Sequence, residues 1–600
     1  MHMRREFQFD VNDHKDNIVY LRETHKLLGN VKLAAIIIVL VCIFFLLSNF
    51  NILLTAFGIL LIQLFILLSI IQIKTEKKIK ESETKLKINQ DYLDRIDGVW
   101  SHFPDKGEEF KDDNHKYTGD LDIFGDNSIF QYLNTTKTWH GRQKFAKDLN
   151  GANFTTEEIR ERQKAVWELS PTKNFTVDFQ FYGSQVRFKH SGSEILGLIS
   201  LLKGKPKANI SPAYRYLLLL PIFSATFILA VFFTGLGALY IPAVLLLFIH
   251  AAFWLLCTVK FSRDLNDITG AGYRVGEYAE LFGMVERKSF EAAALKDIKA
   301  KIKSNNGIIT SEAIKKLDKI IMLIDMRRSG LVYFFLNLFF LWDFICVYFL
   351  RNWQANYQGY VEGWFEAIGE LEALLSFSNL SFVIDNCCLP EISDEKNIEA
   401  KDLGHPLIYI SNRVDNNVAL ENEIFIISGS NMSGKTTFLR TIGINMVLGL
   451  AGGFVCADRL KIPNISISTS MRVLDDLSKG VSTFYAELKR IKVIIDNAKG
   501  EDTLFLIDEM FRGTNSNDRL EGARTVIKDL ELKGSIGLVT THDLALCDLE
   551  DNKRIKNYSF SENYEGSEII FDYKLNAGRS DTTNARFLMN KLGITVEHKT

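Results

Sequence analysis

The stretch Ile427–Ile442, ISGSNMSGKTTFLRTI, contains residue types that can hold a triphosphate. Gly429 and Gly434 frame a loop, and a lysine and a threonine follow at once. Backbone amides of such a loop can surround phosphate oxygens, while the lysine reaches the β- and γ-phosphates and the threonine hydroxyl ligates Mg²⁺. We therefore predict that ATP and Mg²⁺ bind here through Gly429, Ser430, Asn431, Met432, Ser433, Gly434, Lys435, Thr436 and Thr437.

The segments on either side of this loop have the character that it requires. Glu423–Ser428, EIFIIS, is a short apolar run typical of a buried parallel strand. The stretch 437–452, TFLRTIGINMVLGLAG, has a helical pattern that ends in glycines. A strand, a glycine loop and a helix in this order predict an α/β domain of the P-loop type.

Two further apolar runs end in residues that can act on a bound nucleotide. Asp502–Met510, DTLFLIDEM, brings Asp508 and Glu509 to the end of a strand. The first carboxylate can organise Mg²⁺, and the second can orient or deprotonate the attacking water. Gly537–Leu546, GLVTTHDLAL, ends a strand at His542, which can sense a γ-phosphate. We predict Lys435, Glu509 and His542 as catalytic residues and Thr436 and Asp508 as metal ligands.

Taken with DDLSKGVSTFYAELKRI at Asp475–Ile491, these motifs resemble the MutS family of DNA mismatch-repair proteins, within the ABC ATPase superfamily. The family-like elements are GSNMSGKTT, the STF segment, IDE followed by RGT, and TTH. The resemblance implies an ATPase that works as a homodimer, in which Ser482 reaches the partner's nucleotide. It also implies DNA as cargo, whether mismatched, damaged or branched, and it identifies no small-molecule substrate.

The resemblance extends beyond the ATPase segment. Leu121–Leu149 is similar to a MutS core segment, and Ile159–Leu169 to the helix that follows it. Residues 261–389 would then be the lever helices, and 573–594 the dimer-forming end. The first hundred or so residues depart from the family pattern, because nothing in them can serve as a mismatch-recognition domain. The resemblance therefore covers no mismatch-recognition domain.

The bulk composition is that of a large, nearly neutral chain. It has 600 residues, 47% of them apolar, with 44 phenylalanines and a net charge of -2. Such a charge gives no global attraction to nucleic acid. Seven scattered cysteines without a C-x-x-C pattern indicate neither a metal site nor a disulfide framework, and they favour a reducing compartment. The N-terminus, polar up to Leu33, is not expected to be a secretory signal.

Four segments have the length and apolar character of membrane spans: Leu33–Phe50, Ile52–Ile73, Tyr216–Thr234 and Leu239–Val259. Short uncharged turns join them into two hairpins. Lysines and arginines flank the outer ends of both hairpins and are absent from the turns. The positive-inside rule therefore predicts a multi-pass protein of the inner (cytoplasmic) membrane, with its ATPase domain in the cytoplasm and the lipid bilayer as a partner.

A fifth apolar run, Leu331–Leu350, contains Asn337 and Asp343 and has basic residues at both ends. An odd number of spans would place the ATP loop outside the cell. We therefore expect a buried helix of the soluble part.

The expected architecture is an α/β P-loop ATPase domain of the ABC/MutS type, preceded by an α-helical MutS-like core and lever, with two transmembrane hairpins. The segments are a cytosolic tail (1–32), the first hairpin (33–73), a charged helix with core segment (74–215), the second hairpin (216–259), the lever (260–390) and the ATPase domain (391–600). Two alternatives remain, namely an ABC-type transporter half that does not act on DNA, and a membrane scaffold locked by nucleotide. The short spacing between Lys435 and the STF segment leaves little room for a transporter's coupling subdomain.

Overall fold

The structure is a computed structural model with mixed α/β architecture. It describes residues 2–48, 51–151, 153–186, 192–204, 220–235, 237–271, 275–303, 307–472, 483–499, 502–512, 514–551, 553–565 and 568–580. The chain forms two compact units. The first consists of residues 1–134, 148–181 and 377–600, and the second of residues 135–147 and 182–376.

A six-stranded sheet forms the centre of the first unit, with strand order β10-β9-β4-β8-β7-β6. Its strands are β4 (Ile424–Ser428), β6 (Ser466–Ser470), β7 (Thr503–Asp508), β8 (Ile536–Thr541), β9 (Ile555–Glu565) and β10 (Glu568–Ala577). Neighbouring strands are parallel except for the β9–β10 pair. Every residue of β4, β7 and β8 is buried, as expected for parallel strands covered on both faces.

The helices beside this sheet follow its strands in the chain. They are α17 (Lys435–Leu450), α18 (Thr483–Asn497), α19 (Ser516–Leu532) and the 3₁₀ segment η7 (Leu544–Asp551). The side chain of Asn515 caps α19 by accepting a hydrogen bond from the amide of Asp518 at 2.9 Å. Alternate strand residues such as Phe505 and Ile507 pack into a core with Ile491 and Ile527, which lie on α18 and α19. This core supports the strand ends that bear the candidate site.

A second, four-stranded sheet has the order β1-β5-β2-β3. Its strands are β1 (Glu391–Ser393), β2 (Asn397–Leu403), β3 (Asn416–Glu421) and β5 (Arg459–Pro463). The loop 404–415 connects β2 to β3, which pair antiparallel. Shorter helices of this unit are α3 (Ile129–Leu133), α5 (Thr156–Leu169), α6 (Lys173–Gln185, which ends just outside it), α16 (Leu380–Val383), η1 (Trp100–His102) and η2 (Glu108–Phe110).

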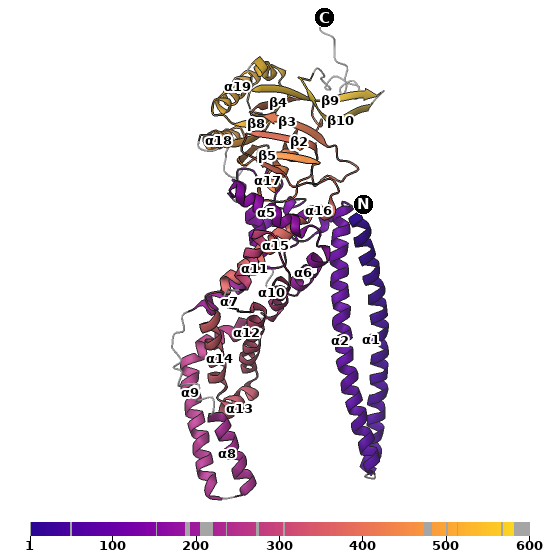
Figure 1. The fold of residues 1–600 in the computed structure, drawn as a ribbon, viewed down its shortest axis with the longest axis vertical. Coiled ribbons are helices and arrows are strands. Elements are labelled where there is room, and N and C mark those ends of the chain that lie inside the picture. The colour runs from indigo at the N-terminus through magenta and orange to yellow at the C-terminus, as the bar shows by residue number, and fades with distance from the viewer. Residues whose placement is uncertain are drawn as a thin grey trace. The chain divides into compact units, whose positions relative to one another are not determined.

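Two long antiparallel helices, α1 (His2–Ser48) and α2 (Ile52–Ile96), form a hairpin (Figure 1). Asn51 begins α2, because its side chain accepts a hydrogen bond from the amide of Leu53 at 2.9 Å. Residues 2–32, described above as a tail, are thus the first part of one continuous helix. The polar halves of the two helices pair through contacts such as Arg22 to Glu83 at 2.6 Å. The apolar halves instead expose their side chains, and Leu47 is 83% exposed.

The polar end of this hairpin is anchored by an aromatic cluster. Phe7 on α1 stacks on Tyr92 of α2 at 4.6 Å, and Phe382 meets both rings edge-on. The Tyr92 hydroxyl donates to Asn379 at 2.6 Å and accepts from Gln180 at 2.7 Å. Burial raises the pKa of Tyr92 to about 12, so the hydroxyl keeps its proton for this bond.

The second unit is helical in its described part. Its helices are α4 (Trp139–Leu149, which ends just outside it), α7 (Gly192–Lys203), α8 (Leu220–Thr234), η4 (Gly237–Leu239), α9 (Tyr240–Ala271), α10 (Gly276–Arg287), α11 (Ala293–Ile302), α12 (Thr310–Asp325), η5 (Met326–Arg328), α13 (Gly330–Phe340), α14 (Trp342–Tyr357) and α15 (Val361–Ser378). In α12, buried Ala313, Ile314, Leu317, Ile321 and Ile324 recur at helical spacing. Trp364 and Phe365 of α15 are among the largest buried side chains.

Among the described residues, three helices are long and apolar enough to cross a membrane: His2–Leu47, Ile52–Ile96 and Gly237–Leu255. The count rises to four if α13 and α14 are taken as one bent span. The apolar helix α8 has only 15 residues, and the start of the expected span, 216–219, lies outside the described residues.

The expectation of one buried helix at Leu331–Leu350 was wrong. The segment breaks at Leu341, where α13 and α14 meet at 81°. Most apolar side chains of α13 are exposed, whereas α14 buries Phe344, Val347 and Leu350. Hydrophobicity alone could not reveal the break, because both halves have the same apolar composition.

Candidate functional site

The glycine loop lies between the end of β4 and the start of α17. Gly429 has φ +147°, and a Cβ atom there would lie 2.8 Å from the carbonyl oxygen of Phe560. Gly434 has φ +102°, and its Cβ atom would lie 3.0 Å from the ring of Tyr573. Backbone conformation and close neighbours therefore both require glycine at the two ends of the loop.

Lys435 folds back across the loop that precedes it. Its Nζ atom donates hydrogen bonds to the carbonyl oxygens of Gly429 at 2.8 Å and Ser430 at 2.7 Å. It also lies 3.5 Å from Nε2 of His542. Burial lowers the pKa of Lys435, and the nearby carboxylates of Glu509 and Asp508 partly oppose that shift. The ammonium group is thus held where the loop would enclose an anion.

Thr436 and Asp508 meet beside the loop. The Thr436 hydroxyl donates to one carboxylate oxygen of Asp508 at 2.8 Å, and the Thr540 hydroxyl donates to the other at 2.5 Å. Parallel pairing of β7 with β8 brings Asp508 opposite Thr540. One carboxylate and one hydroxyl suit Mg²⁺, which takes few protein ligands and completes its shell with phosphate and water oxygens. This donor set therefore fits the metal predicted from the sequence.

Glu509 follows Asp508 in a backbone conformation with φ +50°. Its amide donates to the carbonyl of Thr540 at 3.3 Å. Its carboxylate contacts Nε2 of His542 and lies 2.8 Å from Nε of Arg512. Burial alone would raise the pKa of Glu509, but the hydrogen bond with His542 and the charges of His542, Arg512 and Lys435 together lower it. The carboxylate form is therefore favoured.

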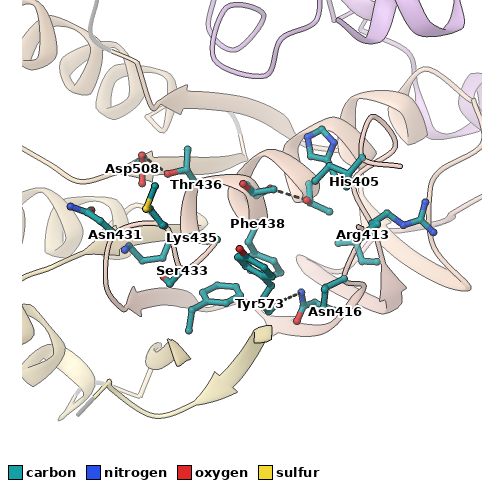
Figure 2. Close-up of a pocket in the computed structure, with 18 of the residues that line it drawn as sticks. His405, Arg413, Asn416, Asn431, Ser433, Lys435, Thr436, Phe438, Asp508 and Tyr573 are labelled. Atoms are coloured by element: carbon teal, nitrogen blue, oxygen red, sulfur yellow. Dashed lines mark hydrogen bonds between the residues drawn. The ribbon is translucent and has the colours of Figure 1, made fainter. Parts of the chain in front are cut away.

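These residues line or adjoin one cavity of about 670 Å³. Figure 2 shows Asn431, Ser433 and Lys435 on one side of it and His405, Arg413 and Asn416 on the other. The lining also includes Met432, Gly434, Thr436, Thr437, Phe438, Asp508, Glu509 and Tyr573. A cavity of this size, with polar groups at one end and aromatic rings beside them, is typical of a small-molecule site.

Two of the loop serines have distinct environments. The Ser430 hydroxyl donates to Glu562 of β9. The Ser433 hydroxyl is buried and has no hydrogen-bond partner among the described residues. A buried hydroxyl that lacks a partner is costly, so this atom is suited to a ligand that brings an acceptor.

The structure also brings together residues that the sequence analysis did not assign to the site. Tyr573, with φ +53°, lies where the β9–β10 register shifts between Phe571 and Leu575. Asn416 fixes this bulge, since its side chain donates to the carbonyl of Tyr573 at 3.0 Å and accepts from the amide of Leu575 at 2.8 Å. Residues 573–594 were predicted only as a dimer-forming end, and 581–594 lie outside the described residues.

Part of the predicted serine segment also lies outside the described residues, including Asp475, Asp476 and Ser482. Glu487, which belongs to the same segment, does not line the cavity. It is 4% exposed, and its carboxylate accepts a hydrogen bond from the amide of Phe511. Glu487 therefore supports the turn that follows Glu509.

The C-terminal third of the chain is similar in sequence to known proteins. Residues 425–588 match the family model of MutS domain V. DNA mismatch repair protein MutS of Methanosarcina mazei is 31% identical over 228 residues, which cover 36% of this chain and 25% of that protein. The Acetivibrio thermocellus protein of the same name is 37% identical over 205 residues, which cover 32% and 23%.

These matches support a MutS-family relationship for the domain V region. The chain spans about a quarter of the length of the curated relatives that it matches. The predicted likeness of Leu121–Leu149 and Ile159–Leu169 to a MutS core stays a prediction.

Proposed function

We propose that this protein is a membrane-anchored, MutS-like ATPase that binds and hydrolyses ATP with Mg²⁺ as a dimer. The observation that carries the proposal is the convergence of Lys435, the Thr436–Asp508 pair and Glu509 on one cavity at the ends of parallel strands. Open α/β sheets bind ligands at this edge. The match to MutS domain V covers the same residues.

Each residue has a distinct part in the proposed reaction. Lys435 would exchange its two carbonyl partners for phosphate oxygens, aided by the amides at the start of α17. Thr436 and Asp508 would hold Mg²⁺, which supplies positive charge against the phosphates. Glu509 would take a proton from the water whose oxygen attacks the γ-phosphorus, as the bond between that phosphorus and the β–γ bridging oxygen breaks. His542 holds the carboxylate of Glu509 in position.

The membrane anchor is supported by the large apolar side chains that each hairpin exposes. Residues such as Leu47 and Leu53 in the first hairpin and Phe232 and Phe248 in the second are 69–83% exposed. Water would not favour so much exposed apolar surface, whereas acyl chains would. Dimerisation through Ser482 and a DNA cargo follow from the MutS resemblance and from the relatives' name, DNA mismatch repair protein.

The proposal is tested by replacing Lys435 in the full chain reconstituted in lipid nanodiscs. Lys435→Ala removes a buried ammonium group, and charged hydrogen bonds contribute about 1.5–3 kcal/mol each, so ATP affinity should fall roughly tenfold or more. Lys401→Ala is the matched control, because Lys401 pairs with Asp458 at 2.6 Å on the exposed face of the other sheet. Equal ATP affinity in Lys435→Ala and the parent protein would refute the nucleotide site.

A further inference from the structure

Helix α13 of the second unit is short, and it ends at a sharp break. Leu341 adopts a left-handed conformation with φ +53°, and the next helix, α14, leaves at 81°. With 11 residues, α13 is about 16 Å long, roughly half of the 30 Å hydrocarbon core of a bilayer. It is too short to cross a membrane, but long enough to enter one leaflet.

The polarity of α13 is the reverse of that in a soluble helix. Its buried residue is the polar Asn337, at 0% exposure. Its exposed residues are apolar, with Leu331 at 77% and Phe335 at 52%. Soluble helices bury their apolar side chains and expose their polar ones, so this arrangement suits an apolar surrounding.

One backbone group on each side of the break has a side-chain partner. The side-chain oxygen of Asn337 accepts the amide of Asp343 at 3.0 Å, which satisfies the start of α14. Nδ1 of His250, on α9, lies 3.1 Å from the carbonyl oxygen of Leu338 near the end of α13. Nε2 of the same histidine lies 2.9 Å from the Ser224 hydroxyl on α8. Irregular backbone can lie at membrane depth only where its polar groups are paired in this way.

The carboxylate at the break has a cationic neighbour and a hydrogen-bond donor. Asp343 is 1% exposed, and one of its oxygens lies 3.4 Å from Nε of Arg327. The Tyr333 hydroxyl donates to its other oxygen at 2.8 Å. A carboxylate close to hydrocarbon is tolerated when it has such partners.

Aromatic contacts make α13 continuous with the α8–α9 hairpin. Trp254 of α9 meets Tyr333 at 6.0 Å and Phe334 at 5.8 Å, and Phe253 meets Phe344 at 5.6 Å. Figure 1 shows α13 beside this hairpin, at the end far from its turn. The exposed apolar side chains of α13 therefore extend the apolar surface of α9, to which Phe248 belongs.

We infer that α13 is a re-entrant half-helix, which enters the leaflet directly after η5 and leaves it on the same side through α14. The inference rests on the proposed membrane anchor of the α8–α9 hairpin. The occupant of the exposed face is lipid acyl chain, because the face continues the hairpin's apolar surface and begins directly after the basic pair Arg327 and Arg328. A re-entrant segment adds no membrane crossing. The side of the membrane predicted for the ATPase domain is therefore unchanged, although this unit has a third apolar segment.

Photo-crosslinking identifies what contacts α13. In separate variants of the full chain in lipid nanodiscs, p-benzoylphenylalanine replaces Phe335, Phe248 of α9, or Leu532. Leu532 is 86% exposed in α19 and serves as the reference in water. Mass spectrometry should find lipid adducts at positions 335 and 248 and none at 532.

The other outcomes are separable. Lipid adducts at 248 combined with a protein crosslink at 335, to this chain or to a second copy, would overturn the inference and leave the anchor intact. Lipid adducts at 248 combined with no adduct at 335 would also overturn the inference and leave the anchor intact. Absence of lipid adducts at 248 would overturn the anchor itself.

A second measurement tests the re-entrant path. Arg328→Cys and Asn356→Cys place thiols before α13 and near the end of α14, at exposed side chains. A membrane-impermeant maleimide should modify both in inverted vesicles and neither in right-side-out vesicles, as judged from peptide masses. Modification of the two positions from opposite sides would show a crossing segment and would overturn the inference.

Discussion

Glu509→Gln is the substitution that separates ATP binding from ATP hydrolysis. Glutamine keeps an oxygen that can accept from Nε of Arg512, now 2.8 Å from the carboxylate, and it keeps the side-chain volume. It loses the basic oxygen that would take a proton from water. The lining of the cavity by Lys435 and Thr436 is unchanged, so ATP affinity should stay close to that of the parent protein.

The expected loss of hydrolysis rate depends on whether another group could act as the base in place of Glu509. Positioned bases contribute roughly 10²–10⁴-fold, which is about 2.7–5.5 kcal/mol of activation free energy. Of the described residues that line the cavity, the carboxylates are Asp508 and Glu509, and both oxygens of Asp508 accept hydrogen bonds. With no spare carboxylate among them, we expect a loss in the upper half of that range, measured as phosphate release at saturating ATP.

The matched control is Glu487→Gln, which alters a buried carboxylate outside the cavity. Since Glu487 accepts from backbone amides of the turn after β7 and does not line the cavity, its variant should retain most of the hydrolysis rate. Normal turnover in Glu509→Gln would refute the assignment of the base. An equal loss in both variants would show that the turn after β7 has collapsed. Because the pKa of Glu509 is lowered, its protonation should reduce the rate only below the ordinary carboxylate range.

Further expected outcomes concern stability and cargo. Gly434→Ala forces a left-handed alanine against Tyr573 and should cost about 1–2 kcal/mol of unfolding free energy, seen as a lower thermal midpoint, with weaker ATP binding. Asp343→Leu leaves Arg327 buried without its ion-pair partner, so the free energy of unfolding should fall by about 3–5 kcal/mol. The double variant Arg327→Leu/Asp343→Leu should recover most of this loss. A double variant as unstable as Asp343→Leu would contradict the pairing. Burial raises the pKa of Glu372 in the folded protein. The stability linked to its protonation is therefore present below the ordinary pKa of glutamate and is lost as pH rises through the pKa of the folded state. Glu372→Gln should flatten this pH dependence, measured as the midpoint of urea unfolding. DNA should change the ATPase rate of the reconstituted protein, and a flat response to duplex, mismatched and branched DNA would favour transport or scaffolding.

The local parts of the candidate site were predictable from the sequence. Apolar runs mark β4, β7 and β8 because parallel strands are buried on both faces, and the glycine loop follows β4 within a few residues. The paired apolar runs likewise predicted helices in hairpins, since their length and hydrophobicity are properties of contiguous residues.

Other features depend on contacts between residues distant in the chain. Tyr573 reaches the glycine loop only because a bulge in β10 is held by Asn416, which is 157 residues earlier. The contact of Glu509 with His542 depends on the parallel register of β7 and β8. Neither sheet register nor a bulge leaves a signal in a single stretch of sequence.

The break at Leu341 likewise combines properties of the local sequence with features that depend on distant contacts. Sequence by itself determined that residues 331–350 are apolar and helical, because both properties are local. Only the tertiary structure decided that Asn337 is buried and Phe335 exposed. The groups that lie against the break come from elsewhere in the chain: His250, beside the Leu338 carbonyl, belongs to α9, and Arg327, beside Asp343, to the turn after α12. Hydrophobicity measures how strongly a segment avoids water, and folding alone determines whether protein or another surrounding replaces that water.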